Sequence, residues 1–241
     1  MLSPARALAD AFFEKPGGGK VIVGGVFEVG GGGTANGWLA PVSAYRGGGL
    51  TTHAEYGLTK SLTLLARTES GSSWLGDRDT RGAGAIGVRG LLFDAGALQV
   101  AAQALASVGA GLDRLPLGRH GSGFALDARL AAVTTFKAAQ VPAFFMVSAG
   151  LRVAEGEAAG GRLDATLGFR PFASLLLLAQ VFGRLDDDPA LSRRVGMFRV
   201  QASAITDLTP EWSVQAGVFA GLPNHRTGRE RGLVAAVIRR F

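Results

Sequence analysis

The sequence predicts an all-β fold, a transmembrane antiparallel up-and-down β-barrel of about 12 strands, on three observations. Segments of roughly ten residues alternate polar and apolar side chains along nearly the whole chain. The connections between these segments are alternately long and short. No apolar run approaches the roughly 18 residues that a membrane-spanning helix needs. Together these patterns indicate strands rather than helices as the elements that cross a bilayer.

Composition narrows the classes of function. The chain has 241 residues with 37 glycines, 18% charged residues and no cysteine, which excludes disulfides and thiolate metal sites. The formal net charge is +6, but the arginines are spread singly along the segments and not clustered with stacking aromatics, so no nucleic-acid partner is expected. The glycine runs match no phosphate-binding loop. We therefore expect no cofactor and no metal.

The N-terminus is set apart from the repeating pattern. The stretch "ARALA" before "DA" has the A-x-A form of the end of a secretory signal, although no apolar segment precedes it. We therefore expect residues 1–16 to be a signal-peptide remnant or periplasmic N-terminal segment, and residues 17–241 to form the barrel.

The expected strands begin at Lys20 and follow one another to the end of the chain. In order they are 20–29, 47–57, 61–70, 82–93, 97–108, 123–136, 143–153, 162–172, 174–185, 195–206, 212–222 and 232–241. The segment 97–108 shows the pattern well, since Gln99, Gln103 and Ser107 share one face and alanine, leucine and valine share the other. Such period-two alternation predicts strands with one polar and one apolar face.

Connection lengths separate a membrane barrel from a soluble sandwich, in which strands also alternate. Long polar or glycine-rich connections follow the odd-numbered segments, at 30–46, 71–81, 109–122, 154–161, 186–194 and 223–231. Short links follow the even-numbered segments, at 58–60, 94–96, 137–142, 173 and 207–211. Outer-membrane barrels sort their connections in this way, with tight turns in the periplasm and longer loops outside.

Two short motifs resemble bacterial outer-membrane β-barrel proteins. The terminal "LVAAVIRRF" is similar to the C-terminal signal of that family, whose last aromatic residue, here Phe241, is recognised by the barrel-assembly machinery. Arg239 departs from the pattern, because the family more often has an apolar or aromatic residue at this position. The stretch "EYGLTKSLTLLA" (55–66) resembles the hairpins of the meta-pathway phenol degradation outer-membrane family. The resemblance implies a Gram-negative outer-membrane location and contact with outer-membrane lipid and lipopolysaccharide.

Membrane barrels carry girdles of aromatic residues where the barrel meets the two membrane–water interfaces. Aromatic residues are few in this chain, but several fall near segment ends: Phe27, Tyr45, Tyr56, Phe93, Phe136, Phe172, Trp212 and Phe241.

Strand parity assigns a set of charged residues to the lumen. The cations are Arg67, Arg89, Arg129, Arg152, Arg170, Arg184, Arg199 and Arg240, and the carboxylates are Glu28, Glu55, Glu69, Asp127 and Asp164. Rings of arginine favour anions in pores. We therefore predict a narrow passive channel for small solutes that is anion-preferring or weakly selective. Barrels of eight strands are filled by side chains, whereas much larger ones hold water, and twelve strands lie between these sizes. A lumen closed by paired charges therefore fits the sequence as well as an open one. The small inward residues Ser148, Gly150, Gly168 and Gly217 favour open space.

Two other classes of function remain as alternatives. A non-conducting structural or adhesion barrel would be expected to carry longer loops than these. An outer-membrane lipid hydrolase needs a nucleophile near a histidine. Of the three histidines, His120 and His225 fall in expected loops. His53 lies two residues from Glu55, and a contact between the two in the lumen is a simpler explanation than a catalytic dyad. No hydrolase motif accompanies them, so we predict that the protein is not an enzyme.

Overall fold

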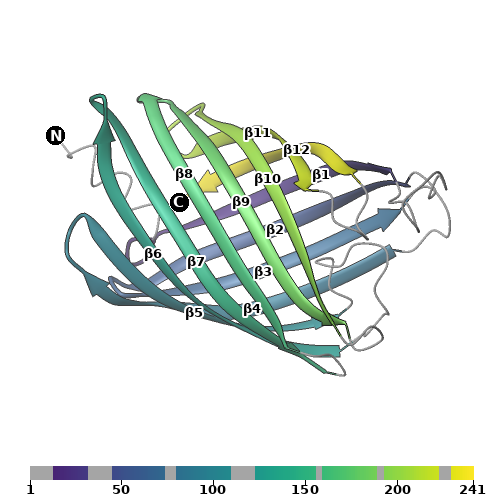
Figure 1. The fold of residues 1–241 in the computed structure, drawn as a ribbon. Coiled ribbons are helices and arrows are strands. Elements are labelled where there is room, and N and C mark those ends of the chain that lie inside the picture. The colour runs from purple at the N-terminus through teal and green to yellow at the C-terminus, as the bar shows by residue number, and fades with distance from the viewer. Residues whose placement is uncertain are drawn as a thin grey trace.

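The computed structural model describes residues 13–31, 45–73, 80–109, 123–155, 159–188, 193–222 and 229–241. These residues form twelve β-strands (Figure 1). The strands are β1 (Gly19–Gly31), β2 (Tyr45–Thr59), β3 (Leu62–Ser73), β4 (Thr80–Asp94), β5 (Leu98–Gly109), β6 (Gly123–Ala138), β7 (Val141–Ala154), β8 (Gly160–Phe172), β9 (Leu175–Asp188), β10 (Arg193–Asp207), β11 (Trp212–Leu222) and β12 (Arg229–Arg240). Within the described part of the chain, no helix is long and apolar enough to span a membrane.

The sheet closes on itself. Each strand pairs antiparallel with its neighbours in the chain, and β1 pairs with β12 from Lys20↔Arg240 to Gly31↔Arg229. A closed barrel leaves no strand edge with unpaired backbone groups, which is the condition for a β-structure to exist in lipid. The predicted fold class and strand number are therefore confirmed. The strands are 11 to 16 residues long, and most are longer than the expected segments because pairing continues into the connections.

The two ends of the barrel differ as the connection lengths predicted. At one end, which we call the turn end, the strands are joined by the tight turns at 60–61, 95–97, 139–140, 173–174 and 208–211. At the other end, which we call the loop end, the strands stop at the boundaries of the described ranges, for example at Gly31, Tyr45, Ser73 and Thr80. Phe241 lies at the turn end, where its backbone N–H donates to the carbonyl of Gly19 at 3.0 Å.

One turn differs from its prediction. The expected link at 137–142 is reduced to Ala139 and Gln140, because β6 and β7 continue pairing as far as Ala138↔Val141. Both turn residues have positive φ, 49° for Ala139 and 67° for Gln140. A two-residue hairpin with this handedness matches the twist of the strands but favours Asn-Gly over the residues present here.

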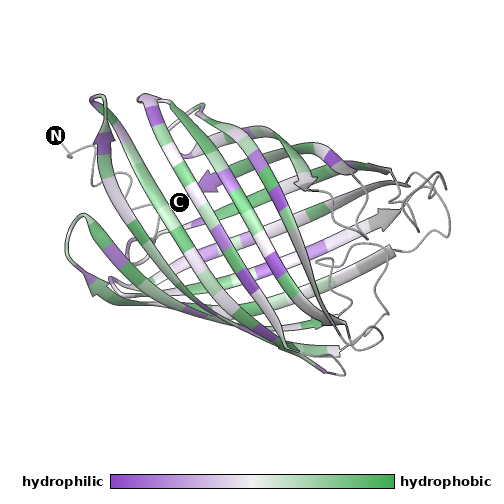
Figure 2. Ribbon diagram, viewed as in Figure 1, coloured by the Kyte–Doolittle hydropathy of each residue, from purple (hydrophilic) through white to green (hydrophobic). Residues whose placement is uncertain are grey.

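Apolar residues cover the outer face. Leucine, isoleucine and valine side chains at outward positions remain exposed, for example Ile86 at 71% and Leu151 at 65%. Inward positions such as Leu65 and Val133 are buried. Figure 2 shows the resulting alternation of hydrophobic and hydrophilic residues along most strands. In a membrane barrel the outward apolar positions need only lipid as their partner.

Exposed aromatic residues border the apolar surface at both ends. At the turn end they are Tyr56, Phe93, Phe136, Phe145, Phe172, Trp212 and Phe241, and towards the loop end they are Phe27, Phe124 and Phe198. The side chain of Tyr45 lies outside the described set. Arg239 stacks over the ring of Trp212 at 5.3 Å from the centroid, so this outward arginine is held among the turn-end aromatics. Such belts mark membrane–water interfaces.

Candidate functional site

The strand register places the predicted lumen residues on the inner face of the barrel. They include the arginines Arg67, Arg89, Arg129, Arg152, Arg170, Arg184, Arg199 and Arg240, with Glu28, Glu55, Glu69, Asp127 and Asp164. The structure adds Lys20, Arg162 and Asp207 to this inner set. Strand alternation alone places Arg162 on the inner face, since it lies two residues from the inward Asp164 on β8.

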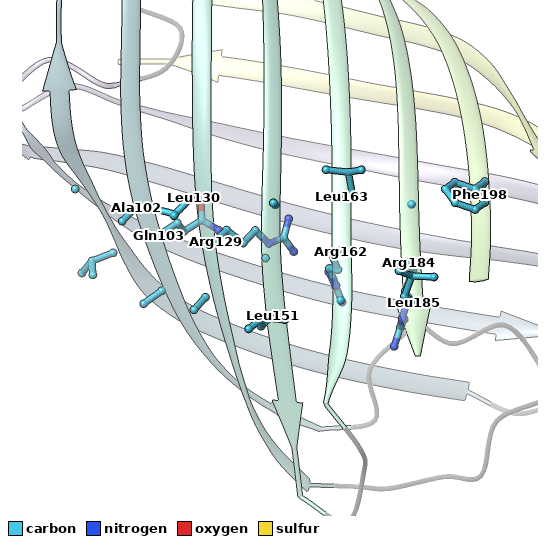
Figure 3. A pocket seen from close by; sticks show the side chains of 18 of the residues that line it. Ala102, Gln103, Arg129, Leu130, Leu151, Arg162, Leu163, Arg184, Leu185 and Phe198 are labelled. Atoms are coloured by element: carbon cyan, nitrogen blue, oxygen red, sulfur yellow. The ribbon is translucent and has the colours of Figure 1, made fainter. Parts of the chain in front are cut away.

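Three of these arginines form a row across the middle strands. Arg129 of β6 faces Gly150 of β7, Gly150 faces Arg162 of β8, and Arg162 faces Arg184 of β9. Figure 3 shows Arg129, Arg162 and Arg184 on these strands. Gly150 is required here because a Cβ at this position would lie 2.6 Å from Cγ of Arg129. We call Arg129, Arg162 and Arg184 the arginine row.

Two carboxylates lie within ion-pair distance of the arginine row. Arg129 Nε is 2.6 Å from Asp127 Oδ1, and its Nη1 is 3.5 Å from Asp164 Oδ2. Arg162 Nε is 3.7 Å from Asp127 Oδ2. Ser148 Oγ donates to Asp164 at 3.4 Å. Two arginines therefore share two carboxylates, and the third guanidinium extends the row to β9.

Interior side chains towards the loop end keep contact with solvent. Arg67, paired with Glu69, is 35% exposed, and Arg199 is 33% exposed. Arg199 Nη2 lies 3.7 Å from Glu28 Oε2, and its guanidinium stacks on the ring of Phe219 at 4.3 Å. Because both side chains point inward, their exposure shows that solvent reaches the interior at this end.

A buried carboxylate organises one side of the turn end. Glu55 is only 5% exposed and receives two hydrogen bonds from Arg89, at 3.2 and 3.1 Å. Lys20 Nζ lies 3.1 Å away and His53 Nε2 2.8 Å away. Arg89 also donates to Gln103 on β5. A desolvated carboxylate is tolerable only with such a set of cationic partners, so this cluster fixes β1, β2, β4 and β5 to one another across the interior.

The N-terminal segment enters the same region. Phe13 is buried against inward Ala101 and Val133, at the centre of an apolar cluster that Leu91, Ala131, Phe144 and Met146 extend. Glu14 pairs with Lys20 at 3.0 Å. Backbone hydrogen bonds join Gly17 and Gly18 to Gly57 of β2. Residues 13–18 therefore occupy part of the turn-end mouth, an arrangement that the expected boundary at residue 16 did not anticipate.

A second ion cluster lies across the turn end on β8, β10, β11 and β12. Asp207 accepts hydrogen bonds from Ser213 at 2.6 Å and from Arg170 at 3.1 Å, and lies 3.5 Å from Arg240. Arg240 also donates to Ser213 Oγ at 2.7 Å. The Ser213 side chain has no exposure to solvent, so this part of the interior is filled by paired polar groups.

The small inward residues do not leave the space that was expected. A Cβ at Gly168 would lie 2.1 Å from the ring of Phe144, and one at Gly217 would lie 2.5 Å from Ser203 Cβ. At Gly150 the space holds Arg129, and Ser148 is bonded to Asp164. Each glycine therefore lies against a neighbouring side chain, and open space in the lumen stays a prediction.

The other inner walls carry few charges. Gln180 donates to Thr166, Gln201 to Gln180, and Gln215 to Ser203, at 3.0 to 3.3 Å. The middle of β1 and β12 is apolar and small on its inner face, at Ile22, Gly24, Val26, Gly232, Val234, Ala236 and Ile238. By strand order this wall lies across the barrel from β6 and β7, which bring Arg129 and Gly150.

Of the three histidines, His53 lies in the part of the chain that the structure describes. His53 belongs to the Glu55 cluster, in which its Nε2 lies 2.8 Å from Glu55 Oε1. No group of three potential metal ligands occurs within the described ranges. His120 and His225 lie outside them, so the absence of enzymatic activity stays a prediction.

Two hollows in the described part of the chain lie mainly over outward residues. One, of about 810 Å³, lies over small outward residues such as Ala128, Ala149 and Gly183 and is bordered by Leu130, Leu151, Leu163 and Leu185 (Figure 3). A second, of about 1030 Å³, reaches from Tyr56 and Phe241 to Val153. Both are lined mainly by outward apolar residues, and their linings also include Arg129, Arg162 and Arg184 in the first and Glu55 and Asp127 in the second.

Solved structures of similar fold were found, although no protein-family model and no curated protein sequence matches the chain. An outer membrane channel from Pseudomonas putida F1 is 14% identical over 95% of this chain and 98% of its own, with a TM-score of 0.70. The NanC porin is 10% identical over 91% and 98%, with a TM-score of 0.58. The translocator domain of the autotransporter NalP from Neisseria meningitidis is 16% identical over 98% and 93%, with a TM-score of 0.54. These likenesses show that the chain has the fold of bacterial outer-membrane β-barrels; membership of the meta-pathway family stays a prediction.

Proposed function

We propose that the protein is a narrow passive channel in the outer membrane of a Gram-negative bacterium, and that it admits small solutes with a preference for anions. The observation that carries this proposal is the charge of the inner face. Among the inward side chains named above, nine arginines and Lys20 stand against six carboxylates, an excess of four positive charges. Fixed positive charge on a pore wall raises the local concentration of anions.

The outer surface supports the proposed location. An apolar band bordered by aromatic residues is suited to contact with lipid, and a closed barrel satisfies every backbone group without water. The proposed partners are outer-membrane lipid and lipopolysaccharide, and the barrel-assembly machinery, for which Phe241 would be the recognised residue. Phe241 closes the seam between β12 and β1 through its pair of hydrogen bonds with Gly19.

The test is the conductance of the refolded protein in a planar bilayer under a salt gradient. We expect discrete steps with a reversal potential displaced towards that of the anion. The variant Arg199→Gln, in the more exposed half of the interior, should move the reversal potential towards zero, whereas Arg239→Gln on the outer face should not. Cation preference in the unmodified protein would refute the assignment of anion selectivity.

A non-conducting barrel is the second candidate, and the packing of the turn end favours it. Phe13, the Glu55 cluster and the Asp207 cluster fill that mouth. A protein that shows a folded, heat-modifiable gel band but no conductance would support this candidate against the channel.

A further inference from the structure

Residues 13–18, which we call the N-terminal flap, lie in the turn-end mouth and are anchored there by a side chain and by the backbone. The ring of Phe13 is buried against Ala101 and Val133. The backbone of the flap is hydrogen-bonded to Gly57 of β2. We propose that the flap is a releasable gate of the turn-end mouth, because the docked flap lies beside buried polar groups that it does not satisfy. Its role as a gate rests on the proposed channel function.

The polar contacts that hold the flap are individually modest. Glu14 and Lys20 form an ion pair at 3.0 Å, and each of these side chains is 15% exposed. Gly17 N–H donates to the Gly57 carbonyl at 2.9 Å, and Gly57 N–H donates to the Gly18 carbonyl at 3.0 Å. Single contacts of this kind each contribute on the order of 1 kcal/mol. A segment held in this way opens at a lower free energy than the barrel as a whole.

The hydroxyl of Thr63 opposes docking of the flap. Thr63 is the inward cross-strand partner of Gly57, and it has no exposure to solvent. The carbonyl oxygens of Glu14 and Lys15 lie over Gly57, 2.5 and 2.3 Å from the position that a Cβ there would take. The flap therefore lies beside Thr63, yet Thr63 Oγ1 finds no hydrogen-bond partner among the described residues. A buried polar group without a partner costs its desolvation, and release of the flap would return this hydroxyl to water.

A second unpaired atom borders the site of the Phe13 ring. Gln99 is the inward cross-strand partner of Val133, on which the ring packs. The side-chain amide of Gln99 donates to Asp94 at 3.2 Å, but its buried Oε1 has no partner within the described ranges. Unpaired polar atoms therefore lie next to both anchors of the flap, and each favours release.

Three consecutive glycines, Gly17, Gly18 and Gly19, lead from the flap into β1. Gly17 has a φ of 79°, and glycine adopts positive and negative φ about equally well. Rotation at these residues can therefore carry the flap out of the mouth while β1 keeps its pairing with β2 and β12.

The test is the rate at which a water-soluble maleimide modifies a cysteine placed beneath the Phe13 ring in the refolded full chain. The sequence has no cysteine, so Val133→Cys, at a position that is 5% exposed, introduces a single thiol that is smaller than the side chain it replaces. Because the thiol reacts when the flap is released, its rate of modification follows the open fraction. Ala125→Cys is the control reporter, since Ala125 is 3% exposed and lies on the same face of β6.

Two variants move the equilibrium in opposite directions. Thr63→Val removes the unpaired hydroxyl and should slow modification at Val133→Cys about tenfold. Glu14→Gln removes the ion pair, leaves the aromatic ring in place and should accelerate the modification about fivefold. Thr206→Val, at an exposed position on the outer face of β10, is matched to Thr63→Val and should change nothing. None of these variants should alter the rate at Ala125→Cys, and heat-modifiability verifies that each one folds.

The outcomes separate the flap from the proposed channel. A rate at Val133→Cys that Thr63→Val or Glu14→Gln leaves unchanged, or equal changes at Val133→Cys and Ala125→Cys, would overturn the flap, and anion-selective conductance in the same preparation would still support the channel. The expected rates in a barrel that does not conduct would support the flap and reject the channel. The expected rates together with two conductance levels, the larger of them less occupied in Thr63→Val, would support both.

Discussion

Replacing Glu55 by glutamine is expected to destabilise the barrel by about 3 kcal/mol, because it removes a buried carboxylate that Lys20 and Arg89 both contact. The side chain of Glu55 is 5% exposed, and those of Lys20 and Arg89 are 15% and 14% exposed. Glutamine preserves the shape and one oxygen acceptor, so the variant tests charge and not packing. Lys20 keeps Glu14 as a partner at 3.0 Å, which limits its share of the loss.

The magnitude follows from the contacts of Glu55. Arg89 donates two hydrogen bonds to it, and Lys20 and His53 contact it at 3.1 and 2.8 Å. Each charge-assisted hydrogen bond contributes about 1.5–3 kcal/mol, and truncating one partner of a buried ion pair costs about 3–5 kcal/mol. Because the amide retains part of the bonding, the lower end of that range applies.

The assay is urea-induced unfolding of the barrel in lipid vesicles, followed by tryptophan emission and by heat-modifiability on gels. Glu211→Gln is the matched control, since Glu211 is exposed in the turn at 208–211, and it should change stability by less than about 0.5 kcal/mol. The double variant Glu55→Gln with Arg89→Gln should lose less than the sum of the two single variants, with a coupling of about 2 kcal/mol. A loss below about 1 kcal/mol for Glu55→Gln would refute the reasoning, because it would mean that water screens these charges as it does at a surface.

Two further perturbations test the turn between β6 and β7 and the docked N-terminal segment. Ala139→Asn combined with Gln140→Gly should stabilise the barrel by about 1–2 kcal/mol in the same urea titration, since both positions have positive φ; unchanged or lower stability would contradict the handedness of this turn. Gly57→Ala should displace residues 13–18 and raise single-channel conductance, because the added Cβ would lie 2.3 Å from the carbonyl oxygen of Lys15. Gly90→Ala is the control, since a Cβ at this position would meet no atom within 4 Å. Equal conductance of the two variants would show that the segment does not narrow the mouth.

The strand number, the strand order and the inner face were predictable from sequence because each depends on local alternation. In β8, for example, Arg162, Asp164 and Thr166 are two residues apart and must share a face whatever the rest of the chain does. The sorting of long and short connections then orients the barrel. No knowledge of pairing partners is needed for either step, which is why parity could assign a residue such as Asp164 to the inner face.

The contents of the lumen depend on contacts between distant parts of the chain and were not predictable in the same way. Glu55 and Arg89 are 34 residues apart in sequence, and both belong to strands that flank a third. Gly150 and Gly168 indicate open space when considered alone, but their cross-strand partners, Arg129 and Phe144, occupy it. Phe13 lay in a segment that resembled processed sequence, and only its burial against β5 and β6 shows a structural role.

The distribution of exposure along the interior separates two properties that a channel combines. Towards the loop end, Arg67 and Arg199 remain about one-third exposed, whereas at the turn end Thr63 and Ser213 have no exposure and Phe13 packs into the mouth. A solute that enters from the loop end would therefore meet Arg199 and Arg67 before it meets the constriction. Substitutions of these two arginines should then alter which ions pass, and substitutions around Phe13 and Gly57 should alter how many pass in a given time. If Gly57→Ala changed the reversal potential as strongly as Arg199→Gln, selectivity and constriction would be the same place, and the separation argued from exposure would fail.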